Sequence, residues 1–163
     1  MQYTREQILE VLDSVKDPEI PVLSLVDLGV ITELLISETN VVSVTITPTF
    51  SGCPAMDTMK KQLEEALLAK GIEHTPVKIS FETPWSSDLL TEKGRAAIKK
   101  FGLAPPPMLG NHQPDIDILE HIACPHCNSE NTEMKSMFGP TLCRSLHYCH
   151  NCLQAFEQFK PLG

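Results

Sequence analysis

The chain has 163 residues, of which 42% are hydrophobic and 21% are charged, a composition typical of a soluble globular protein. Its formal net charge of −8 at pH 7 argues against nucleic acid as a main partner, because phosphate binding requires a dense surface of lysine and arginine. It has neither an apolar run of the roughly 18 residues that span a membrane nor a secretory signal, so we expect a cytoplasmic protein with no membrane partner.

The first predicted element is a helix that begins after Thr4, because Thr4 and Gln7 have the spacing of a capping box. Apolar residues follow at helical spacing. Asp17 precedes Pro18 and is expected to end the helix, since a residue before proline is disfavoured in the helical conformation. The acidic segment 17–21 then forms a stiff loop with two prolines.

The elements that follow are predicted strands and a further helix. Alternating apolar and polar residues, with turn residues between them, favour a hairpin of residues 30–37 and 42–47. The same alternation predicts a third strand over residues 77–81. Residues 91–101 are predicted as a helix that Gly102 terminates.

Between the hairpin and the third strand the sequence predicts a helix with Cys53 at its N-cap and Pro54 at the first helical position. Exposed N–H groups and the helix dipole would favour the thiolate of Cys53 there. Two interpretations stay open: a reactive thiol, with the loop of Asp17 and Glu19 over the same end of the sheet, or a cysteine that only packs. No histidine lies close to Cys53 in the sequence, so nucleophilic catalysis is the minor alternative.

Four of the six cysteines form two C-x-x-C pairs, Cys124 with Cys127 and Cys149 with Cys152, separated by 21 residues. Each pair offers two thiolates on one tight turn, and four thiolates make a tetrahedral cage that suits Zn²⁺. Because four thiolates close the coordination shell, we expect the zinc to be structural rather than catalytic. Iron in a rubredoxin-like site is the chemical alternative.

Other residues in this region leave alternatives open. His126, His147 and His150 could replace a cysteine ligand, and His147 is the best placed, but positions behind the ligands or facing solvent are favoured for all three. Cys143 is either a small buried core residue or a thiolate that Arg144 stabilises for metal or cluster transfer.

The proline-rich composition after residue 103 predicts a division of the chain. We expect a small domain of helices and strands over residues 1–103, a proline-rich linker over 104–121 and a four-cysteine zinc ribbon over 122–163.

Several motifs in this order resemble two known families. The first hundred residues resemble the iron–sulfur cluster assembly domain family, which includes the SufT-like maturation factors, through VKDPEIP (15–21), LVDLGVI (25–31) and TPTFSGCP (47–54). The C-terminal region resembles the ribbon of the PaaD family of the phenylacetyl-CoA ring epoxidase system, through segments 124–127, 136–143 and 149–160. With both halves in this order, the likeness to PaaD covers nearly the whole chain.

The resemblance implies an α+β fold: a mixed-sheet domain with a reactive cysteine at Cys53, followed by a zinc ribbon. It implies a maturation factor rather than a catalyst, one that assists iron–sulfur or iron insertion into an epoxidase component, especially the iron–sulfur reductase. Cys53 would be the transient cluster or iron ligand, Cys143 a further candidate, and Asp17 and Glu19 would shape or charge the pocket. A stoichiometric structural or regulatory subunit is the alternative, and a homodimer stays open.

Overall fold

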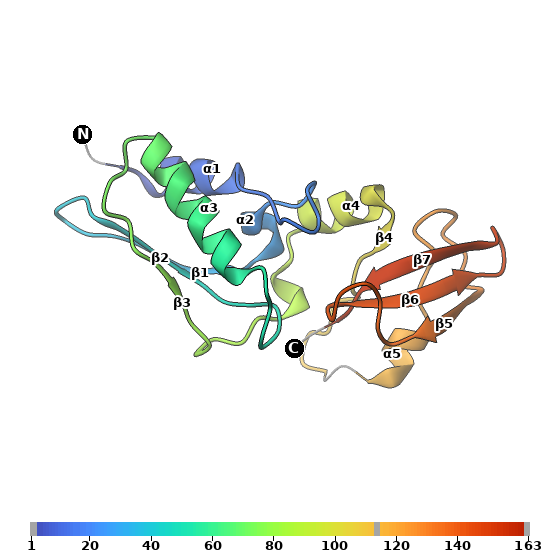
Figure 1. Ribbon diagram of the computed structural model, residues 1–163. Helices are drawn as coiled ribbons and strands as arrows, with labels where there is room; N and C mark the ends of the chain where they lie inside the picture. Colours follow the sequence, from blue (N-terminus) through green and yellow to red (C-terminus); the bar gives the residue numbers. More distant parts are fainter. Residues whose placement is uncertain (1–2, 113–114, 162–163) are drawn as a thin grey trace. The chain divides into compact units, whose positions relative to one another are not determined.

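The computed structural model describes residues 3–112 and 115–161, and its contacts divide the chain into two compact units, Met1–Trp85 and Ser86–Gly163. The first unit contains a three-stranded sheet with helices and the second a four-stranded sheet (Figure 1). The α+β fold class predicted from the sequence is therefore confirmed. Within the described ranges, no helix combines the length and apolar character needed to cross a membrane.

The first helix, α1 (Arg5–Asp13), begins with the predicted capping box. The Gln7 N–H donates to Thr4 Oγ1 over 3.3 Å, and the Thr4 N–H donates to Gln7 Oε1 over 3.0 Å. The helix ends earlier than predicted, because Ser14 is its C-cap and donates its hydroxyl to the Val11 carbonyl over 2.6 Å. The expected stop at Asp17 is therefore wrong, and Asp17 lies in the loop beyond the helix.

A short helix, α2 (Leu25–Leu28), follows this loop and was not predicted. Ser24 is its N-cap and accepts a hydrogen bond from the Asp27 N–H, while Gly29 ends it with a φ of 75°. The Ser24 hydroxyl also donates to Asp13 Oδ1 over 2.6 Å. These bonds explain why four residues suffice for a helical turn here, since both ends are capped.

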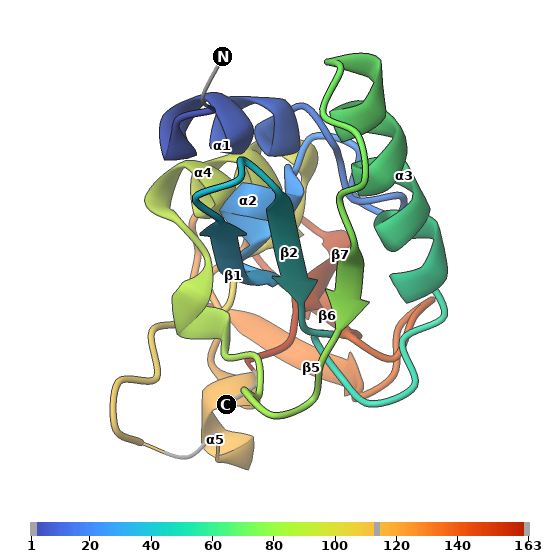
Figure 2. The same ribbon diagram turned by 90° about the vertical axis from the view of Figure 1, so that its left-hand side faces the viewer.

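The sheet of the first unit has the order β1-β2-β3, with β1 (Ile31–Ile36) antiparallel to β2 (Val42–Ile46) and β3 (Val77–Ile79) parallel to β2. The predicted hairpin and third strand are confirmed, although Phe81 lies beyond the end of β3. Helices α1 and α3 lie on one face of the sheet (Figure 1), and β3 is its outermost strand on one side (Figure 2).

Helix α3 (Met56–Ala69) connects β2 to β3. Its N-cap is Ala55, so the predicted placement of Cys53 at the N-cap is wrong. Residues 51–55 form turns instead, and the Cys53 N–H donates to the Phe50 carbonyl over 3.3 Å. The helix packs on the sheet through a core that includes Ile8, Leu12, Val42, Val44, Ile46, Met59, Leu63 and Leu67.

The second unit begins with a 3₁₀ turn, η1 (Ser87–Leu89), and helix α4 (Glu92–Phe101). Thr91 is the N-cap of α4, and Gly102 ends it with a φ of 98°, as the sequence predicts. Strand β4 (Leu103–Ala104) follows at once.

The sheet of the second unit has the order β4-β7-β6-β5. Strands β5 (Thr132–Ser136), β6 (Arg144–Cys149) and β7 (Gln154–Phe159) are antiparallel neighbours, while β4 pairs with β7 in parallel. The pairing with β4 joins the helix α4 to the ribbon. The division by contacts therefore lies before the predicted boundary at residue 103.

The segment predicted as a linker carries structure of its own. It contains Ala104 of β4 and a short helix, α5 (Ile116–Glu120). The carboxylate of Asp88 accepts hydrogen bonds from the N–H groups of Leu109 and Gly110, each over 2.7 Å. These bonds hold part of the proline-rich segment against the start of the second unit.

Candidate functional site

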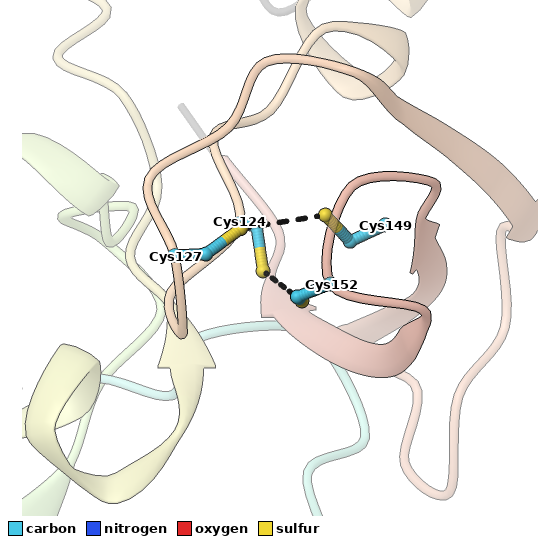
Figure 3. Close-up of side chains that lie close together, drawn as sticks. All are labelled: Cys124, Cys127, Cys149 and Cys152. Carbon is cyan, nitrogen blue, oxygen red and sulfur yellow. Dashed lines mark hydrogen bonds between the residues drawn. The ribbon is translucent and has the colours of Figure 1, made fainter.

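The four cysteines of the two C-x-x-C pairs come together in the second unit (Figure 3). All four sulfur atoms lie within 4.8 Å of one another. The Sγ atoms of Cys124 and Cys152 are 3.7 Å apart, and those of Cys127 and Cys149 are 3.6 Å apart. Zinc bound tetrahedrally at about 2.3 Å from each sulfur would place the sulfurs about 3.8 Å apart, so this donor set fits a thiolate-bound metal.

Local backbone geometry explains why each pair forms a metal-binding turn. In the first turn, the Asn128 N–H donates to the Cys124 carbonyl over 2.8 Å, and the Cys124 N–H donates to the Ser129 carbonyl over 2.9 Å. The residue after each second cysteine has a positive φ, 60° at Asn128 and 58° at Leu153. A leucine seldom adopts this conformation, which indicates that the surrounding turn imposes it.

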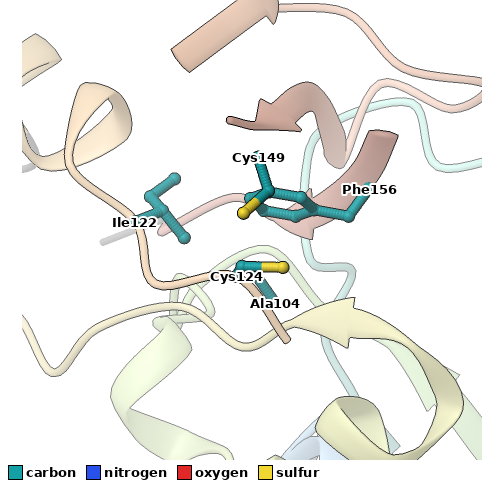
Figure 4. Close-up of a cluster of buried hydrophobic side chains, with 5 residues drawn as sticks. All are labelled: Ala104, Ile122, Cys124, Cys149 and Phe156. Carbon is teal, nitrogen blue, oxygen red and sulfur yellow. The ribbon is translucent and has the colours of Figure 1, made fainter. Parts of the chain in front are cut away.

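An apolar cluster covers one side of the sulfur cage (Figure 4). Cys124 and Cys149 are fully buried, whereas Cys127 and Cys152 are partly exposed. The buried pair packs with Ala104, Ile122 and Phe156. Because Cys124 and Cys149 belong to this small core, a metal bound by them would be coupled to folding of the ribbon.

The cysteines differ in acidity. The pKa of Cys127 is lowered to about 6, chiefly by a hydrogen bond from the backbone of Ser129 and also by the Asn151 side-chain amide, 3.7 Å from the sulfur. The pKa of Cys152 is raised to about 12, chiefly by burial. Of these two thiols, Cys127 loses its proton more readily, and a metal bound by the four cysteines would take the place of the proton on Cys152.

Histidine does not contribute to the four-sulfur group. His126 and His150 are exposed, and His150 Nε2 lies 3.1 Å from a carboxylate oxygen of Glu133. His147 is fully buried, so the solvent-facing alternative is wrong for this residue. It stacks on Phe156 with ring centroids 5.4 Å apart.

A buried polar cluster of Ser145, His147 and Gln158 was not predicted from the sequence. The Ser145 hydroxyl lies 2.8 Å from His147 Nε2 and donates to Gln158 Oε1 over 3.4 Å. Burial lowers the pKa of His147 to about 4, so its ring is neutral at physiological pH. The alternation along a strand could have indicated that residues 145, 147 and 149 share one face.

Cys143 is buried, and its sulfur lies 3.1 Å from the Thr141 hydroxyl oxygen. The predicted helper, Arg144, forms an ion pair with Glu157 over 2.9 Å. A cation near Cys143 that was not predicted from the sequence is Lys160. Burial lowers the pKa of Lys160, and its electrostatic interaction with Cys143 partly offsets this effect. Cys143 belongs to the second unit and Cys53 to the first.

Cys53 lies in the loop that follows the carboxyl end of β2. Thr47 fixes the start of this loop: its N–H donates to the Val30 carbonyl over 2.8 Å, and its hydroxyl donates to the Thr83 carbonyl over 2.9 Å. Cys53 is partly exposed, and Gly52 before it has a φ of 87° with open space where a Cβ atom would lie. The loop thus begins at the edge where the parallel strands β2 and β3 both end, and this edge commonly carries sites in parallel sheets.

Asp17 and Glu19, predicted near Cys53, lie in the loop between α1 and α2. Asp17 is buried, and its Oδ1 accepts hydrogen bonds from the N–H groups of Glu19 and Ile20, each over 2.8 Å. The Glu19 side chain is exposed. Asp17 therefore shapes its own loop, and a role for either carboxylate toward Cys53 stays a prediction.

Two family models match the chain in separate segments. Residues 5–81 match the model described as iron–sulfur cluster assembly protein, and residues 116–160 match the PaaD zinc β-ribbon domain. The first match contains the Cys53 loop, and the second contains all four cysteines of the sulfur cage.

Curated relatives match either the whole chain or its first part. A protein from Escherichia coli (strain K12), whose name describes it as part of the 1,2-phenylacetyl-CoA epoxidase, is 32% identical over 155 residues, which cover 94% of this chain and 91% of that protein. An Fe–S protein maturation auxiliary factor from Porphyromonas gingivalis (strain ATCC BAA-308 / W83) is 34% identical over 91 residues, covering 55% of this chain and 86% of that protein.

Solved structures resemble the first part of the chain as well. A conserved hypothetical protein from Thermotoga maritima is 30% identical with a TM-score of 0.51, covering 63% of this chain and 97% of that one. A domain of unknown function, DUF59, from Bacillus anthracis has a TM-score of 0.53 at 23% identity, covering 57% of this chain and 89% of that one, and it supports the fold alone.

Proposed function

Because the chain belongs to the PaaD family, we propose that it is an accessory component of a phenylacetyl-CoA epoxidase system and assists iron–sulfur or iron insertion into one of the other components. One observation carries this proposal: a single chain joins a segment that matches iron–sulfur cluster assembly proteins to a PaaD zinc ribbon. The names of the relatives from Escherichia coli and Porphyromonas gingivalis support the same two associations.

Cys53 is the proposed transient ligand for the cluster or the iron. Its partial exposure and the open space at Gly52 would let a metal centre and a client cysteine reach the thiol. Transfer would then proceed by thiolate exchange: the client thiolate binds the iron as the bond to Cys53 breaks, with no net redox change. Asp17 and Glu19 would set the charge and shape of the surroundings.

The four-cysteine site is proposed to hold one structural zinc ion. Four thiolates leave no coordination position for water or substrate, which disfavours a catalytic role. The metal would fix the two turns that carry the cysteines and so stabilise a docking platform for the client, with the iron–sulfur reductase component as the first candidate.

The experiment that tests the proposal compares Cys53→Ser with the matched control Ser51→Ala, an exposed residue in the same loop. Each variant replaces the chain in cells that produce the epoxidase system, and iron and sulfide are then measured in the purified reductase component. We expect Cys53→Ser to lower cluster occupancy while Ser51→Ala leaves it unchanged. Full cluster occupancy of the reductase component in cells with a folded Cys53→Ser protein would contradict the transfer role.

Metal analysis of the chain itself separates the two sites. Anaerobic purification is expected to give one zinc per chain in both variants, and labile iron and sulfide only where Cys53 is present. The alternative function, a structural or regulatory subunit without metal transfer, predicts fixed-ratio copurification with the mature oxygenase and no effect of Cys53 substitution.

A further inference from the structure

The loop between β5 and β6 exposes apolar side chains that the core of the ribbon does not cover. In this loop, residues 137–143, which we call the tip loop, Phe138 is 65% exposed and Leu142 is 60% exposed. The tip loop leads into the start of β6, whereas Cys149 of the sulfur cage ends that strand. The two exposed side chains therefore serve neither the core nor the metal ligands.

Hydrogen bonds fix the backbone of the tip loop. The Ser136 hydroxyl donates to the Phe138 carbonyl over 2.8 Å and accepts from the Phe138 N–H over 3.1 Å. The Gly139 N–H donates to the Arg144 carbonyl over 2.8 Å, and the Arg144 N–H donates to the Thr141 carbonyl over 3.1 Å. A loop held in this way loses little conformational freedom when its side chains bind a partner, which is the advantage of a preformed binding surface.

Lys160 gives the tip loop a positive charge. Its ammonium donates to the Met137 carbonyl over 3.1 Å and lies 5.2 Å from the centroid of the Phe138 ring. Among the residues that the structure describes, Lys160 forms no ion pair with a carboxylate. The sequence also has no acidic residue between Glu133 and Glu157, although the net charge of the chain is −8. A partly buried cation beside exposed apolar side chains is complementary to an apolar pocket with a carboxylate at its rim.

We propose, on the basis of the function proposed above, that the tip loop docks this chain on another protein, the epoxidase component that receives the metal. Phe138 and Leu142 enter an apolar pocket of that component, and an aspartate or glutamate at the rim of the pocket pairs with Lys160. A lipid surface is a poorer match, because a single cation on a chain of net charge −8 gives little attraction to anionic headgroups.

The test measures binding of the full chain to each purified component of the epoxidase system by isothermal titration calorimetry. We expect one component to bind, and Phe138→Ser and Leu142→Ser are each expected to weaken its binding at least about tenfold, because each removes an apolar anchor. The matched controls are Met108→Ser and Leu68→Ser, which remove side chains that are 62% and 60% exposed outside the tip loop. Both controls are expected to leave binding unchanged.

Variants of Lys160 test the charge. Lys160→Met is expected to weaken binding about threefold to tenfold and to reduce its dependence on salt, whereas Lys160→Arg is expected to retain both. Lys100→Met, at an exposed position of α4, is the control for the loss of one positive charge. Zinc content and amide NMR spectra of β5 to β7 establish that each variant is folded.

Cys53→Ser separates docking from metal transfer, because it is expected to bind the component as tightly as the original chain. Normal docking without any effect of Cys53→Ser on cluster occupancy would contradict the transfer function and leave the docking proposal standing. The docking proposal itself would be overturned if no component binds the chain, or if both tip-loop variants bind like the original chain. Binding to phosphatidylglycerol vesicles that Phe138→Ser abolishes would also overturn it, in favour of a membrane contact.

Discussion

At the scale of single residues, Cys149 and Cys143 are both buried, but only Cys149 belongs to the four-sulfur group. Cys149 is fully buried and takes part in the apolar cluster behind the cage. Cys149→Ser is expected to abolish stable metal binding and to loosen the ribbon, because three thiolates and a hydroxyl hold zinc far more weakly than four thiolates.

The measurement is metal content after exhaustive dialysis, together with amide NMR spectra of β5 to β7. Cys143→Ser is the control, since this buried cysteine lies outside the four-sulfur group. We expect that variant to keep its metal. Equal metal loss in both variants would contradict the assignment of the cage to the four paired cysteines.

His147 gives a pH prediction. Burial lowers its pKa to about 4, whereas an unfolded chain protonates histidine near 6.5. The stabilisation from a neutral buried ring is therefore complete above pH 6.5 and is lost as pH falls toward 4, since the unfolded state then binds the proton first. Between pH 7 and pH 5 the loss in the free energy of unfolding is expected to be about 2 kcal/mol.

Histidine ring NMR signals check this directly. The His147 ring is expected to show no change in protonation from pH 8 down to pH 5. A midpoint near 6.5 would mean that the ring reaches solvent.

At the scale of elements, α2 shows how much a cap contributes. The Ser24 hydroxyl accepts from the Asp27 N–H over 3.0 Å and donates to Asp13, and Ser24 is fully buried. Ser24→Ala is expected to lower the free energy of unfolding by about 1–2 kcal/mol, because the cap is lost and Asp13 loses a donor. Chemical denaturation checks this, with exposed Ser51→Ala as the neutral reference.

The elements that the sequence predicts correctly are those with local signals. The capping box of Thr4, the alternation in β2 and the pair Thr91 and Gly102 all act within a few residues. Strand β4 has no such signal, because its two residues become a strand only by pairing with β7, more than fifty residues later. The N-cap at Cys53 failed because a proline also suits the turn that precedes a helix.

In the candidate site, too, the features that could be predicted are those that depend on residues close together in the sequence. Ligand spacing within each C-x-x-C pair is local, so the sequence alone predicted the sulfur cage. The polar cluster of Ser145, His147 and Gln158 depends on the register between β6 and β7, which pairs Ser145 with Gln158 and His147 with Phe156. No local pattern specifies that register.

At the scale of the whole molecule, the two units rest on different kinds of core. The first has a helix-on-sheet core of aliphatic side chains, whereas the small core of the ribbon includes metal-binding cysteines. Removal of the metal by a strong chelator is therefore expected to unfold β5 to β7 and to leave β1 to β3 folded. NMR spectra recorded during chelation distinguish this from a simultaneous loss of both sheets, which would contradict the independence of the first core.

The position of Trp85 makes the first unit optically distinct. It is the only tryptophan in the chain, it is 4% exposed, and its indole N–H donates to the Leu28 carbonyl over 2.9 Å. Excitation of the indole at long wavelength therefore reports on the first unit from a buried, hydrogen-bonded position. Emission intensity and its spectral maximum give a label-free signal for opening of the α2 region, one that a cysteine-directed dye could not provide without modifying the thiols under study.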